Sequence, residues 1–179
     1  MLPLGSKLPD FSLPEPAKNN KEFSSADIRA NHCVVIAFIC NHCPYVIHLA
    51  DWFSMLAIDY QDKNLTIVAI NSNDFANYPA DSPQNMVAEV NIRGYTFPYL
   101  FDETQQVAKQ FQAACTPDFF LFNTDRELVY RGQFDDSRPG NDKPITGLDL
   151  RAAIDATLMG EEPDSDQKPS IGCNIKWKG

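Results

Sequence analysis

Apolar residues gather in short, nearly uninterrupted runs along the chain, and such runs predict strands that are buried on both faces of a sheet. The three clearest runs lie at positions 34–39, 65–70 and 119–122. A fourth run, at 128–130, follows the polar turn residues of 123–126. Because a short polar turn joins neighbouring antiparallel strands, the last two runs are predicted to form a hairpin.

Between the first two strands the apolar residues recur every three or four positions, which is typical of a helix with one buried face. Pro44 suits the first turn of this helix, where a missing N–H group costs little. The apolar positions that follow it are Leu49, Phe53, Leu56 and Tyr60. A helix is therefore predicted directly after Cys43.

Three further helices are expected along the chain. Ser82 followed by Pro83 is a start signal for one of them. Asp102 is predicted to be the N-cap of the next, and Leu150 and Ile154 mark the last. Since a helix separates the first two strands, these strands are predicted to be parallel. The order of elements favours an α/β fold with a central mixed sheet flanked by helices.

Both ends of the chain carry additional expected features. The segments 11–13 and 22–23 are predicted to pair as an N-terminal β-hairpin extension. Residues 160–170 are polar, whereas the positions after them are apolar enough to dock on the body. The length of the chain suits one domain. We therefore expect a single domain over 1–179, in which 160–179 form a docking C-terminal tail.

Charge and hydropathy narrow the classes of function. The chain has 179 residues, with 15 Lys+Arg against 24 Asp+Glu and a formal net charge of −9. An acidic chain lacks the basic surface that binds nucleic acid or an anionic membrane. No apolar run approaches the roughly 20 residues that cross a bilayer, and the start does not resemble a secretory signal. The sequence thus predicts a cytoplasmic protein without nucleic-acid or membrane partners.

The cysteines indicate where the chemistry lies. The five cysteines are Cys33, Cys40, Cys43, Cys115 and Cys173. An odd number is not typical of a secreted disulfide framework, and in a reducing cytosol important thiols are usually catalytic, redox-sensing or metal-bound. Cys40 and Cys43 form a CxxC pair at the predicted junction between a buried strand and a helix. In that context the pair indicates a redox motif.

Three segments together resemble a known family. They are the motif Cys40-Asn41-His42-Cys43, the dipeptide Thr116-Pro117 before the third main strand, and the tail sequence at 172–177. The combination resembles the redoxin branch of the thioredoxin-like superfamily, also called the alkyl hydroperoxide reductase/thiol-specific antioxidant family, and in particular uncharacterised bacterial members of it. The resemblance implies a thioredoxin-like fold, an antioxidant role in cell redox homeostasis, and a cis Pro117 that faces the cysteine pair.

The resemblance also implies roles for the motif residues. Cys40 is expected to be the exposed attacking thiol, Cys43 the shielded resolving thiol, and Thr116 and Asn41 part of a substrate groove. The helix N-terminus and a protonated His42 are expected to make Cys40 largely thiolate at neutral pH. Stabilising the reduced form in this way predicts a potential less reducing than that of thioredoxin, which is about −270 mV.

Several roles stay open at this stage. Cys115 suits a structural and a redox role equally, and Cys173 favours a structural role but is also a candidate resolving thiol. Thioredoxins carry a buried acid where this chain has Val34. The proton acceptor for Cys43 is therefore undecided among Asp74, His48 and water.

The function that these observations favour is thiol–disulfide oxidoreductase, with no cofactor and no metal. Its partners would be a disulfide-containing protein or small molecule and a thiol electron donor; the oligomeric state is left open. One alternative is a peroxiredoxin-type peroxidase, with Cys43 in the peroxidatic position; Cys40 and Ile36 then replace the Thr and Pro of that motif. Another is a metal-binding or partner-binding module without turnover, in which the cysteine pair is half of a zinc site.

Overall fold

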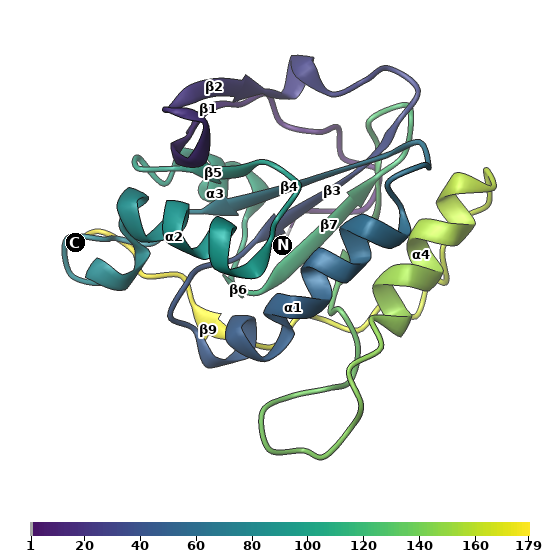
Figure 1. Cartoon of the computed structure of the whole chain (residues 1–179). Coiled ribbons are helices and arrows are strands. Elements are labelled where there is room, and N and C mark those ends of the chain that lie inside the picture. The colour runs from purple at the N-terminus through teal and green to yellow at the C-terminus, as the bar shows by residue number, and fades with distance from the viewer. Residues whose placement is uncertain (1) are drawn as a thin grey trace.

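The computed structural model describes residues 2–179 and is built on a five-stranded mixed sheet with the strand order β5-β4-β3-β7-β8 (Figure 1). The strands are β3 (Cys33–Phe38), β4 (Leu65–Asn71), β5 (Tyr99–Phe101), β7 (Asp118–Phe122) and β8 (Leu128–Gly132). β3 pairs in parallel with β4, and β4 in parallel with β5. β7 is antiparallel to both β3 and β8. The predicted parallel pair and the predicted hairpin are thus confirmed.

Helices and a hairpin cover the two faces of this sheet (Figure 1). Helices α1 (Pro44–Asp59) and α4 (Leu148–Leu158) pack on one face. Helix α3 (Gln106–Phe111) and the N-terminal hairpin of β1 (Ser12–Glu15) and β2 (Lys21–Ser24) pack on the other. The remaining elements are α2 (Pro83–Arg93), the two-residue strands β6 (Cys115–Thr116) and β9 (Cys173–Asn174), and the short 3-10 helices η1 (Pro16–Lys18), η2 (Ser25–Asp27) and η3 (Pro79–Asp81). This arrangement confirms the expected sheet, flanking helices and hairpin extension.

Strand β3 lies at the centre of the core, which explains why its sequence does not alternate. Val34, Ile36 and Phe38 face the hairpin and α3, where Phe38 and Phe111 make an edge-to-face ring contact at 5.3 Å. Val35 and the other alternate positions face α1 and α4. Both faces of the strand are therefore buried, and the cysteine motif that follows it starts from a rigid position.

Helices α1 and α2 begin where the sequence predicts, at Pro44 and Pro83, whereas α3 does not. Ser82 caps α2 by accepting the N–H of Asn85, as predicted. The prediction that Asp102 caps α3 is wrong, because α3 begins at Gln106 and its N-cap is Gln105. The Asp102 carboxylate still binds this helix, since it accepts the N–H of Ala108 at 3.0 Å. A buried acid can thus satisfy a helical N–H group from outside the cap position.

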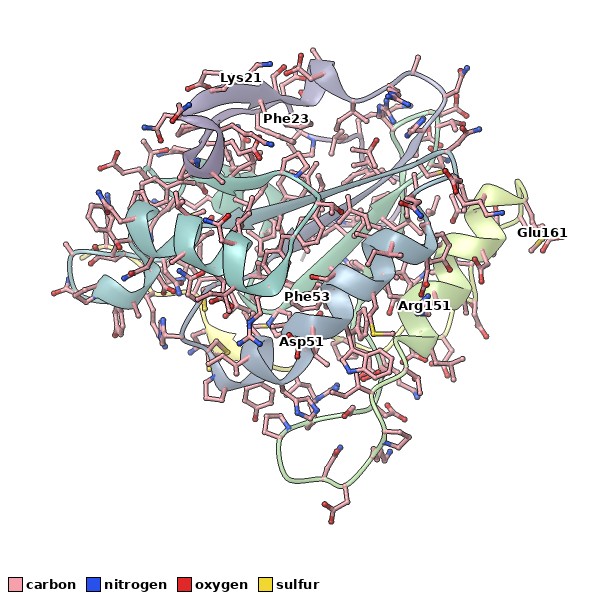
Figure 2. The ribbon with its side chains drawn as sticks, viewed as in Figure 1. Lys21, Phe23, Asp51, Phe53, Arg151 and Glu161 are labelled. Carbon is pink, nitrogen blue, oxygen red and sulfur yellow. The ribbon has the colours of Figure 1, made fainter. Side chains whose placement is uncertain are left out.

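The outer surface carries the charged side chains. Lys21 and Glu161 lie at the margin of the molecule in Figure 2, whereas Phe53 is buried between α1 and the sheet. Arg151 of α4 forms an ion pair with Asp59 of α1 at 2.7 Å. Within residues 2–179, no helix is long and apolar enough to cross a membrane.

Candidate active site

The cysteine motif connects the end of β3 to the start of α1. Cys40 follows the strand, and Cys43 is the N-cap of the helix, with Pro44 at its first position. Both thiols are buried: the exposed fraction is 2% for Cys40 and 0% for Cys43. The prediction of an exposed Cys40 is therefore wrong, because side chains from other segments pack around the motif.

One of these segments contains Thr116 and Pro117, which are joined by a cis peptide bond. The Thr116 hydroxyl lies 3.4 Å from the Cys40 sulfur. The Thr116 carbonyl oxygen lies 3.2 Å from the sulfur of Cys43, which donates to it when protonated. The structure thus brings the cysteine motif into contact with Thr116-Pro117, although the two are more than 70 positions apart in the sequence.

A buried acid that the sequence reasoning missed stands beside this pair. Asp81, at the end of η3, has an exposed fraction of 0%. Its Oδ1 accepts the backbone N–H of Asn41 at 2.7 Å, and its Oδ2 lies 2.6 Å from Nδ1 of His42. The amide of Asn73 donates to the same Oδ2 at 2.8 Å. The positive charge expected from His42 is therefore offset by a carboxylate.

Asp81 comes to the site because of the sheet topology. It belongs to the polar segment after β4, and the carboxyl ends of the parallel strands β3 and β4 meet at one edge of the sheet. The predicted parallel pairing of these two strands was the sequence signal that could have placed the segment of Asp81 near the motif. The position aligned with the acid of thioredoxins, Val34, lies instead in the core on the α3 side.

The two acceptors proposed from the sequence make other contacts. The Asp74 carboxylate accepts from the N–H of Ala76 and from Asn77 at 2.5 Å. His48 lies on α1, where its Nε2 is 2.8 Å from the Ser137 hydroxyl. Neither side chain has a hydrogen bond to a cysteine of the motif in the described chain, whereas a ligand atom of Asp81 lies within 4.8 Å of the Cys40 sulfur.

Asn41 and His42 are held by their own contacts. The amide of Asn41 donates to the carbonyl of Ala80 at 2.9 Å and accepts from the Tyr99 hydroxyl at 2.9 Å. The ring of His42 stacks on Tyr78 with centroids 5.5 Å apart. These contacts fix the backbone of the motif between the two cysteines.

The surroundings place the negative charge on one sulfur of the pair. The thiol of Cys40 donates to the Cys43 sulfur, which also accepts from Cys173 and from the N–H of Val46; these bonds lower the pKa of Cys43. The same Cys40–Cys43 bond, burial and the Asp81 carboxylate raise the pKa of Cys40. These directions are opposite to the prediction that Cys40 is the thiolate. The structure favours an anion on Cys43 at the helix N-terminus.

Removing the carboxylate is expected to make Cys40 easier to ionise. In a Cys43→Ser background, which leaves Cys40 as the motif's one thiol, Asp81→Asn should lower the pKa of Cys40 by roughly one to two units, since a nearby negative charge disfavours a second one. The pH dependence of Cys40 alkylation, followed by mass spectrometry, measures this shift. An unchanged or raised pKa would contradict the charge assignment.

The two remaining thiols near the motif differ in their surroundings. Cys115 is buried and donates to the carbonyl of Pro117 at 3.5 Å. Burial and the charge of Asp118 raise the pKa of Cys115 to about 12, which keeps it a thiol. Cys173 is partly exposed and lies within hydrogen-bonding reach of Cys43.

The site also contains atoms of the kinds that bind metals. The sulfur of Cys40 and one ligand atom each from His42 and Asp81 lie within 4.8 Å of one another. Both oxygens of Asp81 already bind N–H groups or His42, so hydrogen bonds account for this arrangement. A structural zinc site typically has four protein ligands.

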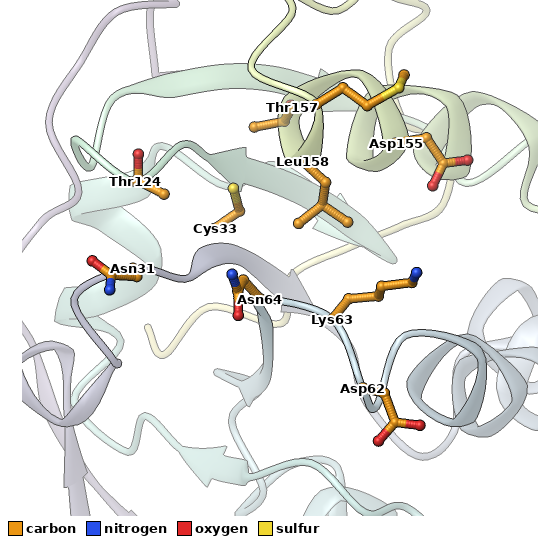
Figure 3. A pocket seen from close by; sticks show the side chains of 10 residues that line it. Asn31, Cys33, Asp62, Lys63, Asn64, Thr124, Asp155, Thr157 and Leu158 are labelled. Carbon is orange, nitrogen blue, oxygen red and sulfur yellow. The ribbon is translucent and has the colours of Figure 1, made fainter.

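A separate cavity of about 710 Å³ lies at the opposite end of β3 from the motif. Figure 3 shows Cys33 between Thr157 and Leu158 of α4 on one side and Lys63 and Asn64 on the other. Burial raises the pKa of Cys33, so this thiol is held protonated. Neither Cys40 nor Cys43 lines this cavity.

Comparisons with known proteins identify the family of the chain. The sequence profile of the Redoxin family matches residues 3–148. An uncharacterised conserved protein from Geobacillus kaustophilus is 52% identical, with 99% of this chain and 94% of that chain covered and a TM-score of 0.96. A hypothetical protein from Sinorhizobium meliloti 1021 is 47% identical, with 100% and 97% covered and a TM-score of 0.97.

A more distant structure extends the comparison to the fold. A putative thiol:disulfide interchange protein DsbE from Chlorobium tepidum is 20% identical, with 88% of this chain and 99% of that chain covered and a TM-score of 0.68. At this identity the likeness shows a shared thioredoxin-like fold. No curated protein matches the chain.

Proposed function

Because the chain belongs to the Redoxin family, we propose that it is a thiol–disulfide oxidoreductase whose redox couple is the dithiol of Cys40 and Cys43. The observation that carries this proposal is the position of the two thiols, which lie at the N-terminus of α1 and both contact Thr116 beside the cis peptide bond. Such a pair has an ionised sulfur ready at neutral pH and a second sulfur beside it, which disulfide exchange requires.

The exchange can be written with the groups at the site. A substrate disulfide is attacked by Cys40 after its proton passes to Cys43 along their hydrogen bond. The first substrate sulfur leaves with the electron pair of the broken bond. Cys43 then attacks the Cys40 sulfur, and the second substrate sulfur leaves with the proton that Cys43 held. The protein gains a disulfide, and the substrate gains two electrons and becomes two sulfur groups, one thiol and one thiolate.

The potential of the couple follows from what stabilises the thiolate. The hydrogen bond from Cys40, the donors of Cys173 and the N–H of Val46 lower the pKa of Cys43, whereas His42 is paired with the Asp81 carboxylate. A stabilised thiolate favours the reduced form, so a potential less reducing than about −270 mV is still expected. This expectation for the potential now rests on the hydrogen bonds to Cys43 rather than on a positive charge of His42.

Redox titration tests the proposal. The protein is equilibrated in glutathione buffers, its free thiols are trapped, and the disulfides are mapped by mass spectrometry. A reversible two-electron couple between Cys40 and Cys43 is expected. If these thiols stay reduced across the range, or are protected until a chelator removes a bound metal, the oxidoreductase proposal is wrong and a binding module replaces it.

One observation favours a second candidate, a thiol peroxidase. Cys43 is the N-cap of α1, the hydrogen bond from Cys40 lowers its pKa, and by resemblance it occupies the peroxidatic position. Stopped-flow oxidation by hydrogen peroxide separates the two functions. A peroxidase would oxidise Cys43 far faster than a free thiol, whereas an exchange enzyme would not.

A further inference from the structure

The C-terminal tail pairs with the chain directly in front of the cis-proline. Strand β9 is antiparallel to β6, with Cys173 opposite Thr116 and Asn174 opposite Cys115. Thr116 is the residue whose hydroxyl and carbonyl contact the two motif sulfurs. The tail thus adds a strand at the site edge in the way a bound peptide would, and it brings a cysteine with it.

The backbone of the tail approaches the site too closely for most residues. A Cβ atom at Gly172 would lie 2.0 Å from the carbonyl oxygen of Thr116, well inside van der Waals contact. Only glycine fits this position. The glycine therefore lets Cys173, the next residue, sit against the Thr116 backbone.

Several bonds hold the rest of the tail in place. Ile175 is 3% exposed and packs beneath the sheet on the side of α3. The N–H of Lys176 donates to Asn73 at 2.9 Å, and its carbonyl accepts from the N–H of Asp74 at 2.8 Å. Asn73 is the residue that also binds Asp81. These contacts fix the position of Cys173 relative to the motif.

The thiols of Cys40, Cys43 and Cys173 differ in their exposure to solvent. Cys173 lies within hydrogen-bonding reach of Cys43 and packs against the core cluster that contains Cys40 and Cys43. Cys40 and Cys43 are covered, whereas Cys173 is partly exposed. A large thiol-bearing partner can therefore contact Cys173 without displacing the tail, but cannot contact Cys40 in this way.

We propose that Cys173 is a third redox thiol of this site, which takes the disulfide of the buried pair and presents it at the surface as a Cys43–Cys173 disulfide. The inference rests on the proposed function, because the Cys40–Cys43 disulfide must form first. The partner that it favours is a thiol-bearing protein or peptide, which exchanges with the surface disulfide.

The transfer step balances within the chain. The Cys173 thiolate attacks the Cys43 sulfur of the Cys40–Cys43 disulfide. The Cys43–Cys173 bond forms, the Cys40–Cys43 bond breaks, and the electron pair stays on the Cys40 sulfur. Cys40 takes up the proton that Cys173 lost. No net oxidation occurs, and the original oxidant is the disulfide substrate of the proposed function.

The test maps disulfides after oxidation by glutathione disulfide. In a Cys33→Ala, Cys40→Ser double variant, Cys43 is left with Cys173 as its neighbour, and a disulfide between them joins two separate tryptic peptides. We expect this linked peptide to be the main oxidised product. If Cys43 and Cys173 both stay free or only carry glutathione, the third-thiol proposal is wrong.

A matched variant shows whether docking of the tail causes the disulfide between Cys43 and Cys173 to form. Adding Gly172→Val to the same background should lower the yield of linked peptide about tenfold, because Cys173 is no longer held against Cys43. An equal yield would contradict the role of the docked tail. The wild-type chain separates the two proposals: without a reversible Cys40–Cys43 couple the proposed function fails, whereas a couple there with no Cys43–Cys173 link overturns the third thiol alone.

Discussion

Cys43→Ser protein is expected to lose thiol–disulfide exchange turnover by at least about a hundredfold, with its fold retained. Exchange needs the second sulfur to resolve the mixed disulfide, and a serine hydroxyl neither holds the charge nor forms the bond. The variant should stop after one mixed disulfide at Cys40. Reduction of a chromogenic aromatic disulfide with dithiothreitol as donor measures the turnover, and circular dichroism checks the fold.

Cys33→Ala is the matched control for this experiment. Cys33 is as buried as Cys40, but it begins β3 at the far end of the strand, beside the separate cavity. This variant should keep its turnover within a factor of about two, since any effect comes only from packing. A Cys43→Ser protein with the same turnover as the control would show that the pair is not the redox couple.

Stability is expected to fall as pH rises from 4 to 7, because of one buried acid. Asp118 follows the cis-proline, and burial raises its pKa from 3.8 to about 6. Below pH 3.8 it is protonated in both the folded and the unfolded chain, so there is no penalty. Between the two values the unfolded chain loses the proton first. Above pH 6 the folded state bears the full cost, about 3 kcal/mol.

Asp118→Asn removes this titration. The free energy of unfolding of the variant, relative to wild type, should therefore increase by about 3 kcal/mol between pH 4 and pH 7. The comparison uses the change with pH, which cancels any constant effect of the amide on packing. Urea unfolding at several pH values measures it. A pH-independent difference between the two proteins would show that Asp118 does not titrate in this range.

The elements of the fold are local properties of this sequence. The run at 34–39 predicts a strand without alternation because a strand with helices or a hairpin on both faces has no polar side. Ser82 and Pro83 mark the start of α2 because capping depends on the first turn alone. The position of the CxxC motif at a strand-to-helix junction follows from the same local patterns.

The chemistry of the site depends on contacts between distant segments, and only the tertiary structure decided it. Asp81 lies beside the motif because the loops after two parallel strands meet at one edge, but only the folded chain shows that this residue of the second loop reaches the motif. The hydrogen bond to Cys43, burial and the Asp81 carboxylate raise the pKa of Cys40, and two of these causes come from segments outside the motif. The local motif therefore determined which sulfurs form the pair. Burial and electrostatic interactions depend on every neighbouring group in space, and they decided which of the two sulfurs favours the negative charge.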